Sequence, residues 1–263
     1  MKRQDGRERL GAIKMIQARQ DQAGAMRVVS WNIHKGVRGI GPLRSLQIHN
    51  IAYALQSMDA DLICLQEVRA QNRREAQRFA HWPQLQQADY LAPEGYHAIY
   101  HSNAVTKHGE HGNALLSRWP VLDVRHEDMS DHRFEQRGLL HAQVAAPQGK
   151  LHVLVLHLGL IGGSRVRQLA QTREYLTSHV PPEEALVIAG DFNCVRLAKN
   201  WAADTLQSAV APQAATFPSR LPLRQLDHIF TRGLNTTELY APRGKAWLQM
   251  SDHLPLVAEL QWR

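Results

Sequence analysis

The feature that most limits the fold of this chain is a strand, a helix and a second strand that occur in this order twice. In the first segment, residues 26–33 alternate apolar and polar side chains, as a strand does. Apolar residues then recur at helical spacing from Ser45, a plausible N-cap, and residues 62–66 form an apolar run that predicts the second strand. Because parallel neighbouring strands need such a helical crossover, this segment predicts one strand–helix–strand unit.

The second segment has the same layout, with apolar strands at residues 151–156 and 186–190 and a helical pattern over residues 165–179. In both segments each strand ends in a polar side chain. These are Asn32, Glu67, His157 and Asp191, the last followed by Asn193. Open α/β sheets bind ligands beyond the carboxyl ends of their strands. The sequence therefore predicts two related units that meet at one cleft.

The rest of the chain is rich in predicted strands and poor in helices. Short strands are expected at residues 96–100, 113–117, 121–126, 139–144, 226–230 and 256–260. The polar, histidine-rich residues 105–112 are expected to form a mobile loop that lines the cleft. Many strands with few helices favour two packed sheets flanked by helices over a doubly wound parallel sheet.

Charge and composition bear on the partner. The formal net charge of +7 favours phosphate-bearing or anionic partners, although a basic surface that is only solvated would give the same value. Aromatic residues make up only 6% of the chain and are not interleaved with basic ones, which argues against a platform that stacks single-stranded nucleic acid.

The two cysteines and the N-terminal segment bear on location. Cys64 and Cys194 do not make a disulfide framework, which fits a reducing, cytoplasmic compartment. Residues 1–25 mix charges without a long apolar run, which excludes a secretory signal or a membrane span there. They are expected to be a flexible basic extension of a single domain at residues 26–263. Their weak apolar face leaves peripheral membrane contact open, and a monomer is expected.

The polar strand ends suit a particular metal chemistry. Carboxylate and amide oxygens, with few histidines and no cysteine pairs, suit Mg²⁺ or Mn²⁺ better than Zn²⁺. Glu67 as the main ligand, helped by Asn32 and Asp252, would suffice, because Mg²⁺ keeps several waters and binds substrate phosphate. His253, which follows Asp252, suits a general base beside a nucleophilic water.

Seven short motifs occur in an order that resembles the endonuclease/exonuclease/phosphatase superfamily, and together they span residues 27–261. They are Trp31-Asn32-Ile33-His34, Leu65-Gln66-Glu67-Val68, Gly112-Asn113-Ala114-Leu115-Leu116-Ser117, His157-Leu158-Gly159, Gly190-Asp191-Phe192-Asn193, Leu226-Asp227-His228 and Ser251-Asp252-His253. The resemblance implies a four-layer α/β sandwich in which two mainly antiparallel sheets pack face to face. It also implies attack of water on a phosphoester, dependent on a divalent metal.

The resemblance also implies roles for individual residues. Glu67 would be the principal metal ligand, and Asp227 would orient the general base His253. Asp191 would position or activate the water or stabilise the leaving group. The remaining members would contact phosphate: Asn193 and His157 in the transition state, and Asn113, Arg137 and His34 at the phosphate site.

The substrate stays open on the sequence alone. The residues after Asn32 lack the second acidic or amide group that nucleases of this superfamily often carry, and the stretch is most like an uncharacterised bacterial branch. A nucleic acid and a phospholipid headgroup are both compatible with a phosphodiesterase. The alternatives are a phosphomonoesterase for a substrate such as an inositol phosphate, and a non-catalytic binding protein that retains the fold.

Overall fold

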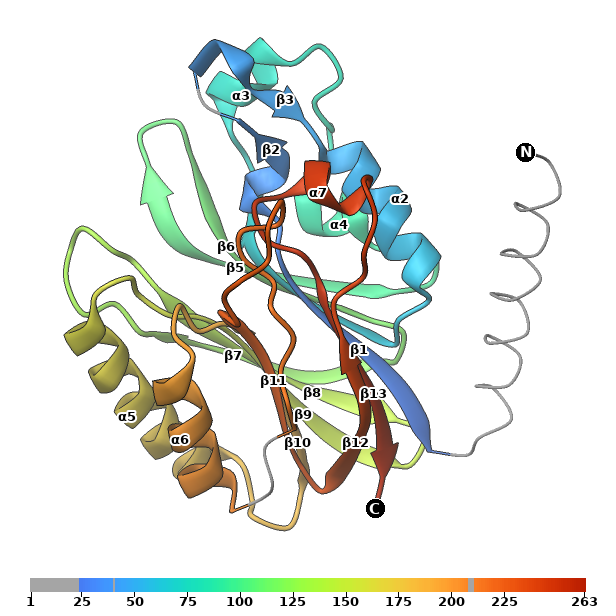
Figure 1. Cartoon of the computed structure of the whole chain (residues 1–263), viewed down its shortest axis with the longest axis vertical. Helices are drawn as coiled ribbons and strands as arrows, with labels where there is room; N and C mark the ends of the chain where they lie inside the picture. The colour runs from blue at the N-terminus through green and yellow to red at the C-terminus, as the bar shows by residue number, and fades with distance from the viewer. Residues whose placement is uncertain (1–23, 40, 208–210) are drawn as a thin grey trace, which may run out of the picture.

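The computed structural model describes residues 24–39, 41–207 and 211–263, and its strands form two large sheets (Figure 1). The predicted extension at residues 1–25 lies almost entirely outside the described residues. None of the helices in these ranges combines the length and hydrophobicity that a membrane crossing requires.

The first large sheet has six strands in the order β12-β13-β1-β4-β6-β5. Only β1 and β4 run parallel; the other neighbours are antiparallel. The parallel pair is joined through helix α2, so it is the first predicted strand–helix–strand unit. The strands are β1 (Ala25–Asn32), β4 (Leu62–Val68), β5 (His97–Thr106), β6 (Gly109–Ser117), β12 (Leu234–Tyr240) and β13 (Leu256–Trp262).

The second large sheet has five strands in the order β11-β10-β9-β8-β7. Here β9 and β10 are the parallel pair, joined through α5 as the second predicted unit, and the other neighbours are antiparallel. The strands are β7 (Val121–Asp128), β8 (Gly138–Ala146), β9 (Gly149–His157), β10 (Ala185–Asp191) and β11 (Asp227–Arg232). A small additional sheet pairs β2 (Val37–Arg38) with β3 (Ser45–Leu46).

The two large sheets pack face to face, and helices cover both outer faces. Val187 and Ala189 of β10 belong to the core between the sheets, whereas the alternate residues Leu186 and Ile188 pack outward against α5 and α6. This alternation follows from the period of two along a strand. Strands buried on both faces are apolar at nearly every position, which is why the sequence shows continuous apolar runs. The four-layer α/β sandwich and its mainly antiparallel sheets are confirmed.

The helices divide between the two outer faces, as Figure 1 shows. Helices α2, α4 and α7 share a buried cluster with the six-stranded sheet, and α5 and α6 share another with the five-stranded sheet. Short helical segments and α3 lie in the connections. The bounds are α2 (Ile48–Met58), α3 (Arg73–Arg78), α4 (Gln87–Leu91), α5 (Gly162–His179), α6 (Arg196–Leu206), α7 (Trp247–Met250), η1 (His34–Gly36) and η2 (Gly41–Leu43).

Two local predictions are wrong. The first helix does not begin at Ser45, which lies in β3; α2 begins at Ile48, because Ser45 and Leu46 pair with β2 instead. Residues 105–112 are not a loop: Val105 pairs with Glu110, and Thr106 with Gly109, at the tip of the β5–β6 hairpin. At both places, pairing with a strand nearby in the chain overrides the preference that the local pattern indicates.

A chain of buried polar side chains lies on the outer face of the five-stranded sheet, under the end of α5. The Tyr175 hydroxyl lies 3.0 Å from His141 Nδ1, and His141 Nε2 lies 2.8 Å from His152 Nδ1. His152 Nε2 contacts the carboxylate of Glu184, which also pairs with Lys150. Burial, and then the neighbouring His152, lower the pKa of His141 to about 4. His141 is therefore neutral near pH 7.

The free energy of unfolding is expected to fall as the pH is lowered from neutrality toward 4. His141 has a pKa near 6.5 when unfolded and about 4 when folded, so between these values the unfolded chain binds a proton that the folded chain excludes. Below both values, the difference corresponds to about 3 kcal/mol for this side chain. Urea unfolding at several pH values measures it. The variant His141→Gln keeps a hydrogen-bond donor and an acceptor but does not titrate, so its free energy of unfolding is expected to fall less with pH than that of the wild type. The control is His97→Gln, which replaces an exposed histidine. If the free energy of unfolding falls equally in the two variants, His141 is not the source of the pH dependence.

Candidate functional site

The carboxyl ends of the two parallel strand pairs meet, as the repeated unit predicts. Asn32 ends β1 and Asp191 ends β10, and Asn32 Nδ2 donates to Asp191 Oδ2 at 3.1 Å across the two sheets. Asp191 is paired with His157 of β9 in the strand register, and His157 Nε2 lies 3.7 Å from Asp191 Oδ2. All three side chains are buried. One contact network therefore joins residues that lie far apart in sequence.

Glu67 reaches this site through an irregular backbone. The pairing of β4 with β6 shifts register between Leu65 and Val68, and Glu67 within this bulge has a φ of 56°. A bulge re-aims a side chain, and a left-handed conformation in a residue other than glycine costs free energy that the surrounding structure must supply. The bulge takes Glu67 out of the regular alternation of β4.

Glycine at position 190 permits the close approach of β9 and β10 just before the site. A Cβ atom at this position would lie 1.9 Å from the carbonyl oxygen of Leu156. No side chain fits there, so the motif needs glycine to bring His157 beside Asp191.

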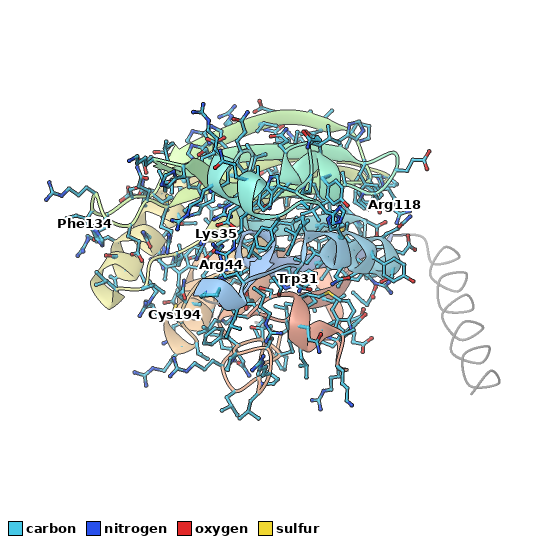
Figure 2. The ribbon with its side chains drawn as sticks, turned by 90° about the horizontal axis from the view of Figure 1, so that it is seen from above. Trp31, Lys35, Arg44, Arg118, Phe134 and Cys194 are labelled. Carbon is cyan, nitrogen blue, oxygen red and sulfur yellow. The ribbon has the colours of Figure 1, made fainter. Side chains whose placement is uncertain are left out.

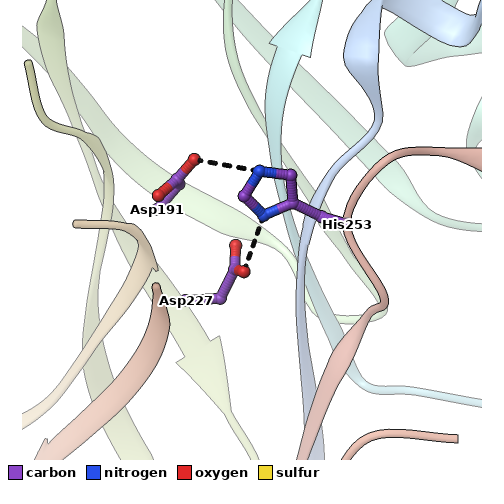
Figure 3. Close-up of side chains that lie close together, drawn as sticks. All are labelled: Asp191, Asp227 and His253. Atoms are coloured by element: carbon purple, nitrogen blue, oxygen red, sulfur yellow. Dashed lines mark hydrogen bonds and ion pairs between the residues drawn. The ribbon is translucent and has the colours of Figure 1, made fainter. Parts of the chain in front are cut away.

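His253 forms the centre of a buried group with two carboxylates (Figure 3). His253 Nδ1 lies 2.8 Å from Asp227 Oδ2, and Nε2 lies 3.6 Å from Asp191 Oδ2. The Thr216 hydroxyl also donates to Asp227 Oδ2. The imidazole is therefore held at one nitrogen and presents the other toward Asp191.

The electrostatics of this group separate its two histidines. Burial by itself would lower the pKa of His253, but Asp227 and then Asp191 outweigh it and raise the pKa to about 10. Burial, and then Arg137, lower the pKa of His157 to about 4. Burial also raises the pKa of Asp191. Near pH 7 the site thus favours an imidazolium at His253 and a neutral imidazole at His157.

A second set of acidic groups lies close to the first, because Glu67 interacts with His157 and Asp252 with His253. His34 Nδ1 lies 3.3 Å from Asp252 Oδ2, and Lys35 Nζ lies 2.6 Å from Glu67 Oε2. Burial raises the pKa of Glu67, but Lys35 outweighs it and holds the pKa well below its usual range. Burial, and to a smaller extent the charge of Glu67, tend to raise the pKa of Asp252, but His34 and then His253 outweigh them and lower it. The two carboxylates are thus close enough to interact, and both are ionised at neutral pH.

The residues present fit a hard divalent cation. Glu67 and Asp252 supply carboxylate oxygens, and Asn32 supplies an amide oxygen, Oδ1, that accepts one hydrogen bond from the His34 backbone at 3.1 Å. Such donors suit Mg²⁺ and Mn²⁺. Glu67 already pairs with a cationic group, Lys35. The potential ligand atoms of Asp191, Asp227 and His253 also lie within 4.8 Å of one another, but Asp227 Oδ2 there already accepts two hydrogen bonds.

The residues predicted to contact phosphate differ in what they can still donate. Asn193 Nδ2 donates to the Leu158 carbonyl at 2.9 Å, which uses one of its two hydrogens. Asn113 Nδ2 donates to the carbonyls of Gly138 and Val155 at 2.8 and 3.1 Å, and its Oδ1 is buried without a partner among the described residues. An oxygen acceptor does not bind phosphate, so this geometry favours a structural role for Asn113.

Arg137 and His34 lie beside the site with part of each side chain exposed. Arg137 Nε donates to the Leu158 carbonyl at 3.1 Å, and Nη2 to Glu135 Oε1 at 3.3 Å. Its charge lowers the pKa of His157, so the guanidinium lies near that imidazole. His34 is held by Asp252 but keeps 41% of its side chain exposed. Both can reach a ligand that enters the site.

Several residues that shape the site were missed in the sequence. Trp31 Nε1 donates to the His253 carbonyl at 3.0 Å, and the Ser251 hydroxyl donates to the Asn32 carbonyl at 2.7 Å. Thr216 holds Asp227, and the Phe217 ring packs against the His253 ring with centroids 4.8 Å apart. Trp31 and Ser251 stand inside recognised motifs, which was a usable signal. Thr216 lies in no regular element, and nothing in its local sequence ties it to Asp227.

A family model supports the resemblance carried by the motifs. The model of the endonuclease/exonuclease/phosphatase family matches residues 29–253. The chain belongs to this family. Members of the endonuclease/exonuclease/phosphatase family are hydrolases that act on phosphoester bonds, typically with a divalent metal.

Individual relatives agree with this family. The chain is 33% identical to YbhP of Escherichia coli strain K12 over 251 residues, which cover 92% of this chain and 98% of YbhP. An endonuclease/exonuclease/phosphatase from Beutenbergia cavernae superposes with a TM-score of 0.74 at 22% identity, covering 91% of this chain and 72% of that one. The human Nocturnin catalytic domain, with bound sulfate, superposes with a TM-score of 0.68 at 18% identity, covering 92% and 95%. The two structures show a shared fold.

Proposed function

We propose that this protein is a divalent-metal-dependent phosphodiesterase that hydrolyses its substrate by attack of water. The observation that carries the proposal is the juxtaposition of two groups: the buried His253, Asp227 and Asp191, and beside them the ionised Glu67 and Asp252. The first group can move a proton and the second can hold a cation. Hydrolysis of a phosphoester needs both functions at one place.

The base is the neutral form of His253, which a divalent cation held nearby would favour by repelling the imidazolium. In that form His253 accepts the proton from the attacking water at Nε2, and Asp227 stabilises the imidazolium that forms, through the 2.8 Å contact at Nδ1. The raised pKa of His253 reflects this stabilisation. Asp191, 3.6 Å from Nε2, positions the water or stabilises the leaving group. His253 would thus act as the base, Asp227 as the carboxylate that orients it at Nδ1, and Asp191 as a second carboxylate beside Nε2, where the water would react.

Hydrogen-bond donors surround the place where phosphoryl charge would develop. His157 is neutral near pH 7, and a neutral imidazole still carries one N–H group that can donate a hydrogen bond to a phosphoryl oxygen. Asn193 retains one amide hydrogen, and Arg137 and His34 are within reach of the same region. Donors fixed by the fold in this way stabilise a transition state at little cost in reorganisation. A divalent cation held by Glu67, Asp252 and Asn32 would polarise the phosphoryl group and lower the pKa values of nearby water and imidazole.

Hydrolysis of bis-p-nitrophenyl phosphate with Mg²⁺, with Mn²⁺ and with EDTA tests this function. We expect turnover that depends on metal and exceeds that on mono-p-nitrophenyl phosphate. A preference for the monoester would favour the phosphomonoesterase alternative. The absence of metal-dependent turnover on a broad phosphoester panel, together with failure to bind Mn²⁺, would favour a binding protein that retains the fold. A cytoplasmic location and a monomeric state remain part of the proposal.

A further inference from the structure

Exposed apolar side chains gather on the loops around the site. Six of them are between 54% and 81% exposed, although aliphatic and aromatic side chains of this size are usually buried. We call them the rim residues: Val105, Phe134, Leu160, Ile161, Leu221 and Leu223. They come from the β5–β6 hairpin, the β7–β8 loop, the β9–α5 loop and the segment before β11. Contiguous exposed apolar surface beside a site commonly marks an interaction surface.

Three of these loops are tied to one another. Leu160 N donates to Glu135 Oε1 at 2.9 Å, which joins the β9–α5 loop to the loop that carries Phe134. Val105 N donates to Gln136 Oε1 at 3.1 Å, which joins the hairpin tip to the same loop. In Figure 1 the hairpin tip, the β7–β8 loop and the N-terminal end of α5 lie on one side of the molecule, and Figure 2 shows Phe134 at the outer end of its loop.

The same loops are continuous with the site. Leu160 and Ile161 follow His157 after two residues, and the intervening Leu158 carbonyl accepts hydrogen bonds from Asn193 and Arg137. On the other side, Ser219 N donates to the Asp252 carbonyl at 2.7 Å, which holds the segment with Leu221 and Leu223 against the site. The rim residues therefore flank the reactive groups on two sides.

Arginines are interleaved with the rim residues. The Arg133 guanidinium lies 4.6 Å above the Phe134 ring, and Arg165 Nη1 donates to the Leu160 carbonyl at 2.6 Å. Arg220 lies beside Leu221 and close enough to Arg38 to lower its pKa by repulsion. Within the described residues, none of Arg133, Arg165 and Arg220 forms an ion pair with a carboxylate. The positive charges of these three arginines are thus available to an anionic partner, although the same loops also carry the carboxylates of Glu110 and Glu135.

Apolar tips combined with unpaired arginines fit one kind of partner better than another. At an anionic bilayer, apolar side chains enter the headgroup and acyl boundary while arginines stay with the lipid phosphates. A nucleic acid would bind the arginines through its phosphates, but it would make no favourable contact with the five aliphatic rim residues. Bases stack on aromatic side chains, and Phe134 is the only aromatic rim residue. The composition of the rim therefore favours a lipid surface.

We propose that the rim residues dock the protein on an anionic phospholipid surface, so that the phosphodiester presented to the site belongs to a lipid headgroup. The choice of substrate rests on the proposed phosphodiesterase function, whereas docking does not. With the rim against the bilayer, His157, Asp191 and His253 would face the headgroup layer, where the phosphodiesters lie.

Flotation with vesicles in the presence of EDTA tests docking without any turnover. The full chain is expected to float with vesicles of phosphatidylcholine containing phosphatidylglycerol, and to float less with phosphatidylcholine alone or at high salt. Leu160→Ser/Ile161→Ser and Leu221→Ser/Leu223→Ser are each expected to weaken the binding at least about tenfold, since each removes two apolar contacts. Leu122→Ser is the matched control, because Leu122 is 59% exposed but lies at the start of β7, at the far end of the sheet from the site.

Activity assays separate this inference from the proposed function. The two double variants are expected to keep wild-type hydrolysis of soluble bis-p-nitrophenyl phosphate but to lose release of headgroup from vesicles. No flotation of the wild type, or an equal loss in Leu122→Ser, would overturn docking even if the soluble diester is hydrolysed. A tenfold loss of plasmid DNA binding in the same variants would also overturn it, since the rim would then bind nucleic acid. Flotation without any hydrolysis of the soluble diester would support docking while the proposed function fails.

Discussion

His253→Asn is expected to lower the turnover of bis-p-nitrophenyl phosphate by about 10²- to 10⁴-fold, the usual contribution of a general base. Asparagine can still donate a hydrogen bond to Asp227, which would otherwise remain as a buried charge without its partner. The side chain can no longer accept a proton, however. The loss is therefore expected mainly in kcat, with little change in KM, because the ground-state contacts with substrate are kept.

The control variant is His97→Asn, in which an exposed histidine on β5 is replaced. Circular dichroism and thermal unfolding should show that both variants are folded. If His253→Asn keeps wild-type turnover, His253 is not the base. If it unfolds while His97→Asn does not, the 2.8 Å contact with Asp227 is chiefly structural.

The partner carboxylate extends this first test. Because Asp227 acts through His253, Asp227→Asn combined with His253→Asn is expected to lose no more turnover than His253→Asn alone, as residues that act as one unit are strongly non-additive. A multiplied loss in the double variant would show that Asp227 acts independently of His253.

Glu67→Gln is expected to weaken the binding of Mn²⁺ at least tenfold, or about 1.4 kcal/mol. The substitution keeps the shape of the side chain and removes the charge that a hard cation requires. The apparent metal requirement for turnover is expected to rise by a similar factor. Isothermal titration with Mn²⁺ measures binding directly, so the result does not depend on the substrate chosen.

Glu94→Gln provides the matched control, because Glu94 is exposed in the loop before β5. Unchanged Mn²⁺ affinity in Glu67→Gln would mean that the 2.6 Å contact with Lys35 is the whole role of this carboxylate. In that case Asp191, Asp227 and His253, whose potential ligand atoms lie within 4.8 Å of one another, would become the candidate metal ligands.

Two kinds of local information made most of the fold predictable. Strands that are buried on both faces have continuous apolar runs in the sequence. In the helices that connect parallel strands, apolar residues instead recur every three or four positions. The polar side chains at strand ends then identified Asn32, Glu67, His157 and Asp191 as candidates, and the structure brings Asn32, His157 and Asp191 into one network of contacts. The order of motifs added the family, which the family model confirms.

Other features depend on pairs of residues that no local pattern connects. The β5–β6 hairpin tip looked like a loop because its residues are polar, and the hydrogen bonds that extend the strands come from pairing across the hairpin. Helix α5 buries the apolar Leu169 and Leu176, but it also buries the polar Gln168 and Thr172, whereas Val166 is exposed. Gln168 donates a hydrogen bond to the Met129 carbonyl and accepts one from the Gly159 backbone N–H. The sequence of the helix does not indicate that these two backbone groups require a partner.

The sequence by itself determined the two strand–helix–strand units, the layered fold and the candidate site residues, because short stretches of chain carry the apolar periodicity and the polar strand ends. Only the tertiary structure decided how these residues are arranged. It turned Glu67 through a bulge, occupied the amide of Asn113 with backbone carbonyls, and placed Asp227 and Asp191 on either side of His253. It also brought apolar tips from four separate loops around the site. The physical reason is that pKa values, hydrogen-bond partners and exposure depend on distances in space, which neighbouring residues in sequence do not specify.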